Sequence, residues 1–189
     1  MEKRQIHFQS DLKIRNSGNE NEGIIEGYFV RYNSETNLWG NFYEEIAQGA
    51  LDESLRNKNI LCLDNHDTRI VLGSTATRTL ELHSDEIGLF GKVTLDLEDP
   101  EAKSAYRKVQ TGKVRGCSFG FYVEEEETTY DDNKTKWIIK KADLIEVSIT
   151  AFPAYPQTDI SARQADYESI KKELFNKRKK ELKERLING

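Results

Sequence analysis

The sequence has few cysteines and no long apolar run, and each shortage excludes a class of protein. Two cysteines, Cys62 and Cys117, in 189 residues are too few for the disulfide framework of a small secreted domain. No stretch approaches the ~20 apolar residues of a membrane span. The N-terminus also lacks the basic segment and apolar run of a signal peptide. We therefore expect a soluble cytosolic protein with reduced thiols.

An excess of basic charge is also missing from most of the chain. The net charge is −5, and it divides unevenly: residues 163–189 carry nine Lys or Arg against five Asp or Glu, and residues 1–162 carry 19 against 28. An acidic body gives no support for nucleic-acid binding, which needs a basic face. The tail, residues 163–189, has the mixed charges of an amphipathic surface helix.

The residues that are present predict a mainly β protein with flanking helices, of the α+β class. The length favours one domain with room for an appendage, and we place the domain at 1–162 and the helical tail at 163–189. Strands are predicted at 1–15, 24–33, 59–67 and 115–127, in a hairpin over 77–98, and in two runs within 136–152. The segment 42–57 should contain the end of a strand and a short helix that starts near Gly49. Further helices are predicted at 99–112 and 164–187.

The predicted helix at 99–112 has the clearest boundaries. Asp99 suits the N-cap, Pro100 the first helical position and Gly112 the position after the last turn. Apolar side chains at helical spacing define one stripe that should face the core. The stripe consists of Ala102, Ala105, Tyr106 and Val109.

One serine lies in the alternating stretch CSFGFYV, residues 117–123. Alternation places Cys117, Phe119 and Phe121 on one face of a strand, and Ser118 and Gly120 on the other. Because the apolar set marks the core side, Ser118 should point outward or into a cleft, where Gly120 leaves room for a substrate backbone. An ordinary exposed strand serine fits the same pattern. Cys117, on the apolar face, is expected to be a small buried hydrophobe rather than a nucleophile.

Two further residues are candidate partners for Ser118. His66 follows an apolar strand, where a loop on a rigid support can present a general base. In DLIEVSITAF, alternation places Ile145 and Val147 on the core face and Glu146 on the other face. A polar turn residue and a solvent-facing glutamate are the alternative interpretations. Together the three residues supply a nucleophile, a base and a group that orients the base, but spacing alone does not show that they converge.

The order of several short motifs resembles the prohead, or capsid maturation, serine proteases of tailed bacteriophages. These are distant relatives of the herpesvirus assemblin proteases. The resemblance covers roughly residues 24–162 and depends on linked blocks rather than on one motif. The blocks are Gly49-Ala50 before a helix, His66 followed by Leu72-Gly73, Gly88-Leu89, Gly116-x-Ser118-x-Gly120-Phe121, and Glu146-Val147-Ser148 with Pro153-Ala154 behind it.

This resemblance implies an assemblin-like β-barrel flanked by helices, and a serine endopeptidase that acts inside an assembling procapsid in the host cytoplasm. The implied roles are nucleophile for Ser118, general base and acid for His66, and third member for Glu146. Assemblins use a second histidine as third member, which makes His83 the alternative to Glu146. A metal site from Asp64, His66, Asp67 and His83 is a further alternative, but its spacing matches no established ligand pattern.

The resemblance also implies the partners. The substrates would be scaffolding protein, or the scaffolding segment of the major capsid protein, and the protease itself, with a homo-oligomer as a further expectation. No cofactor, membrane or specific nucleic acid is implied. The oxyanion hole would use the backbone N–H of Ala154 or Tyr155, since Pro153 has none. The tail would be lost by self-cleavage near residues 155–165. The alternative function is a catalytically silent capsid-assembly or scaffolding protein with the same fold.

Overall fold

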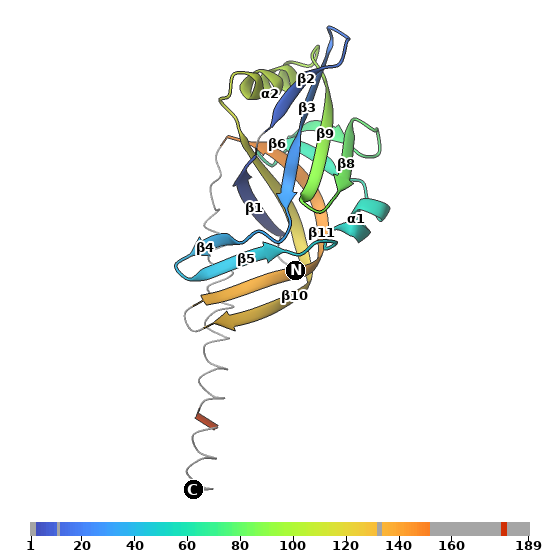
Figure 1. The fold of residues 1–189 in the computed structure, drawn as a ribbon. Helices are drawn as coiled ribbons and strands as arrows, with labels where there is room; N and C mark the ends of the chain where they lie inside the picture. Colours follow the sequence, from blue (N-terminus) through green and yellow to red (C-terminus); the bar gives the residue numbers. More distant parts are fainter. Residues whose placement is uncertain (1–2, 11, 132–133, 152–178, 181–189) are drawn as a thin grey trace, which may run out of the picture. The chain divides into compact units, whose positions relative to one another are not determined.

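A computed structural model of the chain describes residues 3–10, 12–131, 134–151 and 179–180. The chain divides into a unit of residues 1–155 and a second unit of residues 156–189. In the second unit only residues 179–180 are described, and both are helical. The rest of the predicted tail helix lies outside the described residues. Figure 1 shows the elements of the first unit.

The larger of two β-sheets is built around one long strand, β11 (Lys134–Thr150). β11 pairs antiparallel with β10 (Gly116–Asp131), and β10 pairs on its other side with β1 (Lys3–Gln9). The opposite edge of β11 carries two parallel partners, β5 (Phe42–Ile46) at its first half and β6 (Leu61–Asp64) at its second half. The sheet is completed by β4 (Thr36–Trp39), which pairs with β5, and β7 (Asp67–Ser74), which pairs with β6.

The second sheet has four antiparallel strands, in the order β2 (Lys13–Asn16), β3 (Glu22–Arg31), β9 (Gly88–Asp96) and β8 (Leu80–Ser84). Among the described residues, the ladders end at β2 and β8 in this sheet and at β1, β4 and β7 in the other. Closure into a barrel requires every strand to have a partner on both sides. The expected β-barrel is therefore wrong for this chain, because the strand pairing branches at β11 instead of continuing around a ring.

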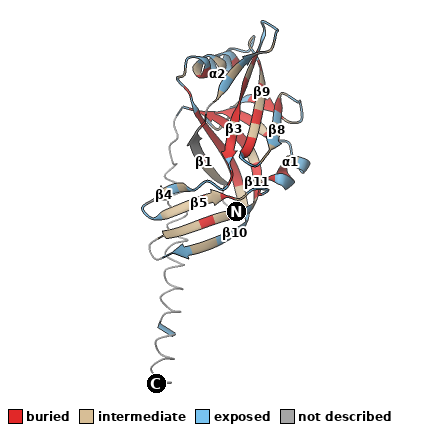
Figure 2. Ribbon diagram, in the orientation of Figure 1, coloured by how far each residue is buried: buried red, intermediate tan, exposed pale blue. Residues whose placement is uncertain are grey.

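One apolar cluster fills the interior between the two sheets, and Figure 2 shows that the buried positions concentrate where β3, β9, β10 and β11 lie together. The predicted alternation in β10 is confirmed, since Cys117, Phe119 and Phe121 are all buried in this cluster. Phe119 and Phe121 stack, with ring centroids 5.1 Å apart. Both cysteines are free thiols inside the core. Because the core covers this face of β10, the candidate nucleophile Ser118 lies on the opposite face.

The predicted helix at 99–112 is confirmed as α2 (Pro100–Gln110). The Asp99 carboxylate accepts the backbone N–H of Glu101 at 2.9 Å, which satisfies a donor at the helix start. Gly112 adopts a φ of +69°, a left-handed conformation that ends the helix without strain. Ala102, Ala105 and Val109 are buried, and Tyr106 packs against the core.

Several boundaries differ from the sequence-based prediction. The expected strand at 1–15 is two strands in different sheets, and the two runs within 136–152 form one strand of 17 residues. α1 (Asp52–Asn57) starts after a turn in which Gly49 has a φ of +83°. β7 was not predicted, because its first residues are polar and its sequence does not alternate between apolar and polar residues. The hairpin over 77–98 is confirmed as β8 and β9.

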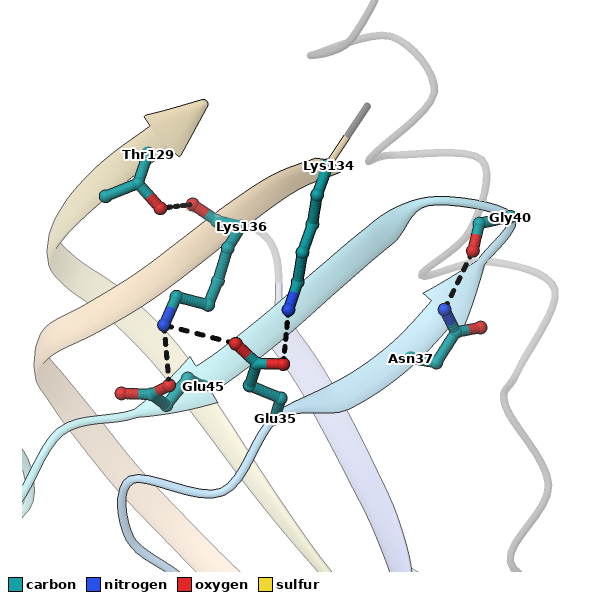
Figure 3. A network of polar contacts seen from close by, with 7 residues as sticks. All are labelled: Glu35, Asn37, Gly40, Glu45, Thr129, Lys134 and Lys136. Carbon is teal, nitrogen blue, oxygen red and sulfur yellow. Dashed lines mark hydrogen bonds and ion pairs between the residues drawn. The ribbon is translucent and has the colours of Figure 1, made fainter. Parts of the chain in front are cut away.

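The first half of β11 and the end of β10 extend beyond the core as an arm with β4 and β5 (Figure 1). The Lys136 ammonium lies 3.0 Å from Glu45 and 3.3 Å from Glu35, and Lys134 also bonds to Glu35. Figure 3 shows these contacts. Exposed ion pairs contribute at most about 1 kcal/mol each. Apolar packing anchors the arm more firmly, since the buried Trp137 ring stacks on Phe42 at 5.7 Å.

Candidate active site

Ser118 lies on β10 between two strands, with His7 of β1 and Ser148 of β11 as its register partners. It occupies the face opposite to the apolar core residues of β10, as alternation predicts. Its exposure differs from the prediction, because the side chain is 0% exposed. The hydroxyl donates a hydrogen bond to the backbone carbonyl of Ile6 on β1, with an Oγ–O distance of 2.8 Å. The nucleophile candidate is therefore covered, and its proton is bound by β1.

His66 is presented by the two-residue turn that joins β6 to β7. Asn65 and His66 have φ values of +51° and +62°, and successive positive values are typical of a type I′ hairpin turn. A positive φ is uncommon outside glycine, and asparagine and histidine are among the residue types that adopt it most readily. Contacts to the neighbouring strand hold the turn: the Asn65 N–H donates to the Ile149 carbonyl at 2.9 Å, and its side-chain oxygen accepts the Ala151 N–H at 3.1 Å.

The imidazole of His66 contacts Glu146 directly. Its Nδ1 lies 2.7 Å from Oε1 of Glu146, and the two side chains are 12% and 2% exposed. An ionised carboxylate only accepts hydrogen bonds, so Nδ1 carries the proton in this contact. In the neutral ring Nε2 is then the basic nitrogen, which is the state of a general base ready to accept a proton. We call His66 and Glu146 the dyad.

A β-bulge in β11 lies directly before Glu146. Gly120 pairs with Glu146 and Phe121 pairs with Leu144, so Ile145 is an extra residue without a register partner in β10. Leu144 and Val147 are both buried in the core, three positions apart instead of two. The prediction that Ile145 and Val147 share the core face is wrong, because the bulge shifts the alternation by one residue. Bulges bend a strand and are common beside active sites. Here the bulge lets both halves of β11 bury apolar residues while Glu146 stays on the non-core face.

Two residues of the site were given no role by the sequence-based prediction. Ser148 is fully buried, donates to Oε2 of Glu146 at 2.7 Å and lies 3.3 Å from Nδ1 of His66. Its signals were its position two residues after Glu146 on the same face and its place in the Glu146-Val147-Ser148 block. Asn65 clamps the turn that carries His66. Its signal was a turn-forming residue directly after an apolar strand.

The fold brings the three predicted residues into one neighbourhood without joining all of them by hydrogen bonds. Ser118 is the cross-strand neighbour of Ser148, and such pairs have Cβ atoms about 4.5–5.5 Å apart. Ser148 in turn contacts both members of the dyad. A hydroxyl has a single proton, and in this conformation Ser118 directs it to Ile6 and not to the imidazole. The arrangement contains a candidate nucleophile, an oriented imidazole and a buried carboxylate, and the candidate nucleophile is hydrogen-bonded to β1.

The other candidates lie elsewhere. His83 is exposed on β8 in the four-stranded sheet, opposite Phe90. Ala154 and Tyr155 lie outside the described residues. Burial raises the pKa of Cys117 to about 12 and raises the pKa of Cys62 well above its ordinary value. Both cysteines are therefore thiols at neutral pH, and a thiol is a poor nucleophile compared with a thiolate.

The residues considered for a metal site each have another partner or place. The Asp64 carboxylate lies 2.8 Å from the Lys108 ammonium, and the Asp67 carboxylate 2.6 Å from the Arg69 guanidinium. In the described part of the chain, no group of three or more His, Cys, Asp or Glu side chains is placed to hold a metal ion. The described helices are also all too short or too polar to cross a bilayer.

The chain is similar to known proteins in sequence and in fold. The prohead protease of Enterobacteria phage HK97 is 29% identical over 159 residues, and the match spans 82% of this chain but only 66% of the length of that relative. The capsid assembly protease of bacteriophage T4 has a similar fold, with a TM-score of 0.51 and 13% identity over 81% of this chain and 100% of that one. Residues 10–173 match the caudovirus prohead serine protease family, and the chain belongs to that family.

Proposed function

We propose that this chain is a serine endopeptidase of phage capsid maturation in which Ser118, His66 and Glu146 form the catalytic triad. The observation that carries the proposal is the 2.7 Å contact between Nδ1 of His66 and Glu146, beside the strand that presents Ser118. A buried carboxylate fixed to an imidazole orients the ring and stabilises its protonated form. Family membership adds the expected reaction class.

In the proposed reaction, the Ser118 oxygen attacks the scissile carbonyl carbon while Nε2 of His66 takes the hydroxyl proton. The new C–O bond gives a tetrahedral oxyanion, and Glu146 stabilises the imidazolium. The imidazolium then protonates the leaving amine as the C–N bond breaks, which leaves an acyl-enzyme on Ser118. Water, activated by the same imidazole, hydrolyses the ester and restores the serine. The steps need no metal or cofactor.

The oxyanion requires hydrogen-bond donors, and we assign them to the backbone N–H of Ala154 or Tyr155, after the proline that cannot donate. Removing one such donor costs about 3–4 kcal/mol of transition-state stabilisation in other acyl-transfer enzymes. The hydrogen bond between Ser118 and Ile6 has to break before His66 can take the proton, and the buried hydroxyl has to be uncovered before a substrate can reach it.

We propose that the substrates are the scaffolding protein, or the scaffolding segment of the capsid protein, and the protease itself, within the assembling procapsid. The names of the two relatives, a prohead protease and a capsid assembly protease, support this assignment. The alternative is a catalytically silent assembly protein of the same fold. The dyad geometry favours the enzyme, because a silent protein has no need of a buried carboxylate fixed to a histidine.

The test is co-expression of the chain with its capsid and scaffolding partners, followed by measurement of fragment sizes. Ser118→Ala should abolish cleavage, since removing the nucleophile of another serine protease lowers kcat about 10⁶-fold. Ser54→Ala is the matched control, because Ser54 is also buried and hydrogen-bonded but lies on α1 beside Ala142 and Leu144. Ser118→Cys with partial activity would support the nucleophile assignment. Identical fragments from the wild type and Ser118→Ala would reject the protease.

A further inference from the structure

Ser148 is a third buried polar residue of the site, and it contacts both members of the dyad. Its hydroxyl oxygen lies 2.7 Å from Oε2 of Glu146 and 3.3 Å from Nδ1 of His66, and the side chain is 0% exposed. Ser148 and Glu146 are two residues apart on β11, so both side chains project from the same face of the strand. One buried hydroxyl therefore touches the proposed base and the carboxylate that orients it.

The protons in this network can be assigned one by one. Ser148 has a single hydroxyl proton, and the carboxylate of Glu146 can only accept, so that proton points to Oε2. The lone pairs of Ser148 are then left for Nδ1 of His66, which must be the protonated nitrogen because it also faces Oε1. Reversing the ring tautomer would place a lone pair of Nδ1 against the carboxylate. The hydroxyl thus completes a set of contacts that permits only one tautomer.

Glu146 also needs this donor for a second reason. The carboxylate is almost completely withdrawn from water, and an ionised carboxylate in such a place is unstable unless hydrogen bonds replace its hydration. His66 bonds to one oxygen and Ser148 to the other. The two donors stabilise the negative charge of the carboxylate and fix the orientation of its plane, so that Oε1 faces the imidazole.

We infer that Ser148 is a positioning residue of this site, whose hydroxyl fixes the Glu146 carboxylate and thereby holds His66 in the tautomer that can accept the Ser118 proton. The inference rests on the proposed protease function for its catalytic meaning, but the network itself can be tested without activity. The alternative is a structural hydroxyl that satisfies a buried site and has no effect on the imidazole.

Four other titratable groups on the described parts of the strands near the dyad are paired or neutral. On the β6 side, Asp64 pairs with Lys108 of α2, and on β7 Asp67 pairs with Arg69. Cys62 on β6 lies close enough for the Glu146 charge to contribute to its raised pKa, and the thiol is neutral near pH 7. Cys117 on β10 is likewise a neutral thiol. A change at Ser148 should therefore appear in the titration of the dyad itself.

The test is an NMR titration of the imidazole of His66 in the full-length protein, with His66→Gln to assign its resonance among the three histidines. Ser148→Ala removes a donor to the carboxylate, so the negative charge of Glu146 is less compensated and the imidazolium beside it is favoured. The midpoint should rise by about one pH unit. Ser54→Ala, which loses a comparable buried hydroxyl on α1, should leave the midpoint unchanged.

The same variants then enter the cleavage assay. Ser148→Ala should move the acidic limb of the pH–rate profile to higher pH and lower kcat about tenfold or more, whereas Ser54→Ala should do neither. Ser148→Cys keeps the volume but is a weaker donor, so its midpoint should rise in the same direction by less. This variant keeps the test decisive where Ser148→Ala is unstable.

Midpoints of Ser148→Ala and Ser148→Cys that coincide with the wild type would overturn the positioning role and leave a structural hydroxyl. The proposed function fails by a different result, namely cleavage by the Ser118→Ala protein. A shifted midpoint with no cleavage by the wild type would retain the hydrogen-bond network and reject only its use in proteolysis. The two failures are therefore separable.

Discussion

At the scale of single residues, the site depends on charge that has been removed from water. Glu146 is buried on the non-core face of β11, and in the proposed mechanism the imidazole of His66 beside it becomes positive when it takes the serine proton. A buried carboxylate that meets a transient imidazolium stabilises the transition state more than the ground state. The contribution of Glu146 should therefore appear in kcat and much less in substrate binding.

Glu146→Gln tests this directly. The amide keeps the size of the side chain but removes the charge, and we expect kcat to fall by up to about 10⁴-fold, the loss found when the carboxylate of a Ser-His-Asp protease is replaced by an amide. Single-turnover cleavage at several substrate concentrations separates kcat from KM. Glu26→Gln, at a buried glutamate of the other sheet, should have little effect. Equal rates for Glu146→Gln and the wild type would exclude the third-member role.

The two cysteines give a prediction with a definite pH sign. Burial raises the pKa of Cys117 to about 12 and that of Cys62 also rises, so both stay protonated at pH 8 and only the thiolate reacts with alkylating agents. Iodoacetamide at pH 8 should leave the folded protein unmodified by mass spectrometry and modify both residues in urea. Cleavage activity should survive this treatment. Rapid alkylation of Cys117 with loss of activity would restore the cysteine-peptidase interpretation.

At the scale of elements, the β6–β7 turn determines the position of His66, the proposed base. Asn65 has a positive φ and clamps the adjacent strand through Ala151. Asn65→Gly loses the clamp but accepts the backbone, whereas Asn65→Ala loses the clamp and adds about 1–2 kcal/mol of left-handed strain. The free energy of unfolding, measured in urea, should therefore be about 1–2 kcal/mol lower for Asn65→Ala than for Asn65→Gly. Similar stabilities would mean that the turn relaxes and that its backbone is not strained.

We expect β1 to be a second element that controls access to the site, because Ser118 bonds to its Ile6 carbonyl. Arg4 contacts Glu44 and Glu126, at 3.6 Å and 3.2 Å, and so helps to hold β1 over Ser118. Arg4→Glu places like charges there and should loosen β1. If the lost ion pairs stabilised the covered state by about 1 kcal/mol, the uncovered state becomes about fivefold more populated. Labelling of Ser118 by a fluorophosphonate should then be about fivefold faster. Lys13→Glu on the exposed face of β2 is the charge-matched control. Unchanged labelling in Arg4→Glu would show that β1 does not limit access.

The features that could be predicted from the sequence are those that depend on local periodicity. Alternation placed Ser118 on the non-core face of β10, and the cap and stop residues bounded α2. Features that depend on distant pairing were missed. The burial of Ser118 depends on the Ile6 carbonyl, 112 residues away in the sequence. The open sheets follow from β11 pairing with two separate parallel strands, and the bulge at Ile145 follows from its register against β10.

At the scale of the whole molecule, the acidic body and the basic tail are the units whose separation can be tested. If the protease cleaves itself, purified wild-type protein should lose its tail at a site near residues 155–165 during prolonged incubation. Mass spectrometry gives the new terminus, and the Ser118→Ala protein should stay intact under the same conditions. An intact wild-type chain, together with cleavage of an added scaffold substrate, would mean that the tail is not a substrate.

The bulge at Ile145 has a consequence for how such a chain can change over time. Deleting that single residue would leave Leu144 opposite Phe121 and Glu146 opposite Gly120, so the ladder would become regular and each side chain would keep its face. Deleting Val147 instead would put Glu146 and Ser148 next to each other and turn them to opposite faces. The position before the glutamate is therefore a place where homologous strands can differ in length by one residue without inverting the site. Sequence alignments of this fold should allow a gap there, or the Glu146 carboxylate will be matched to the wrong residue.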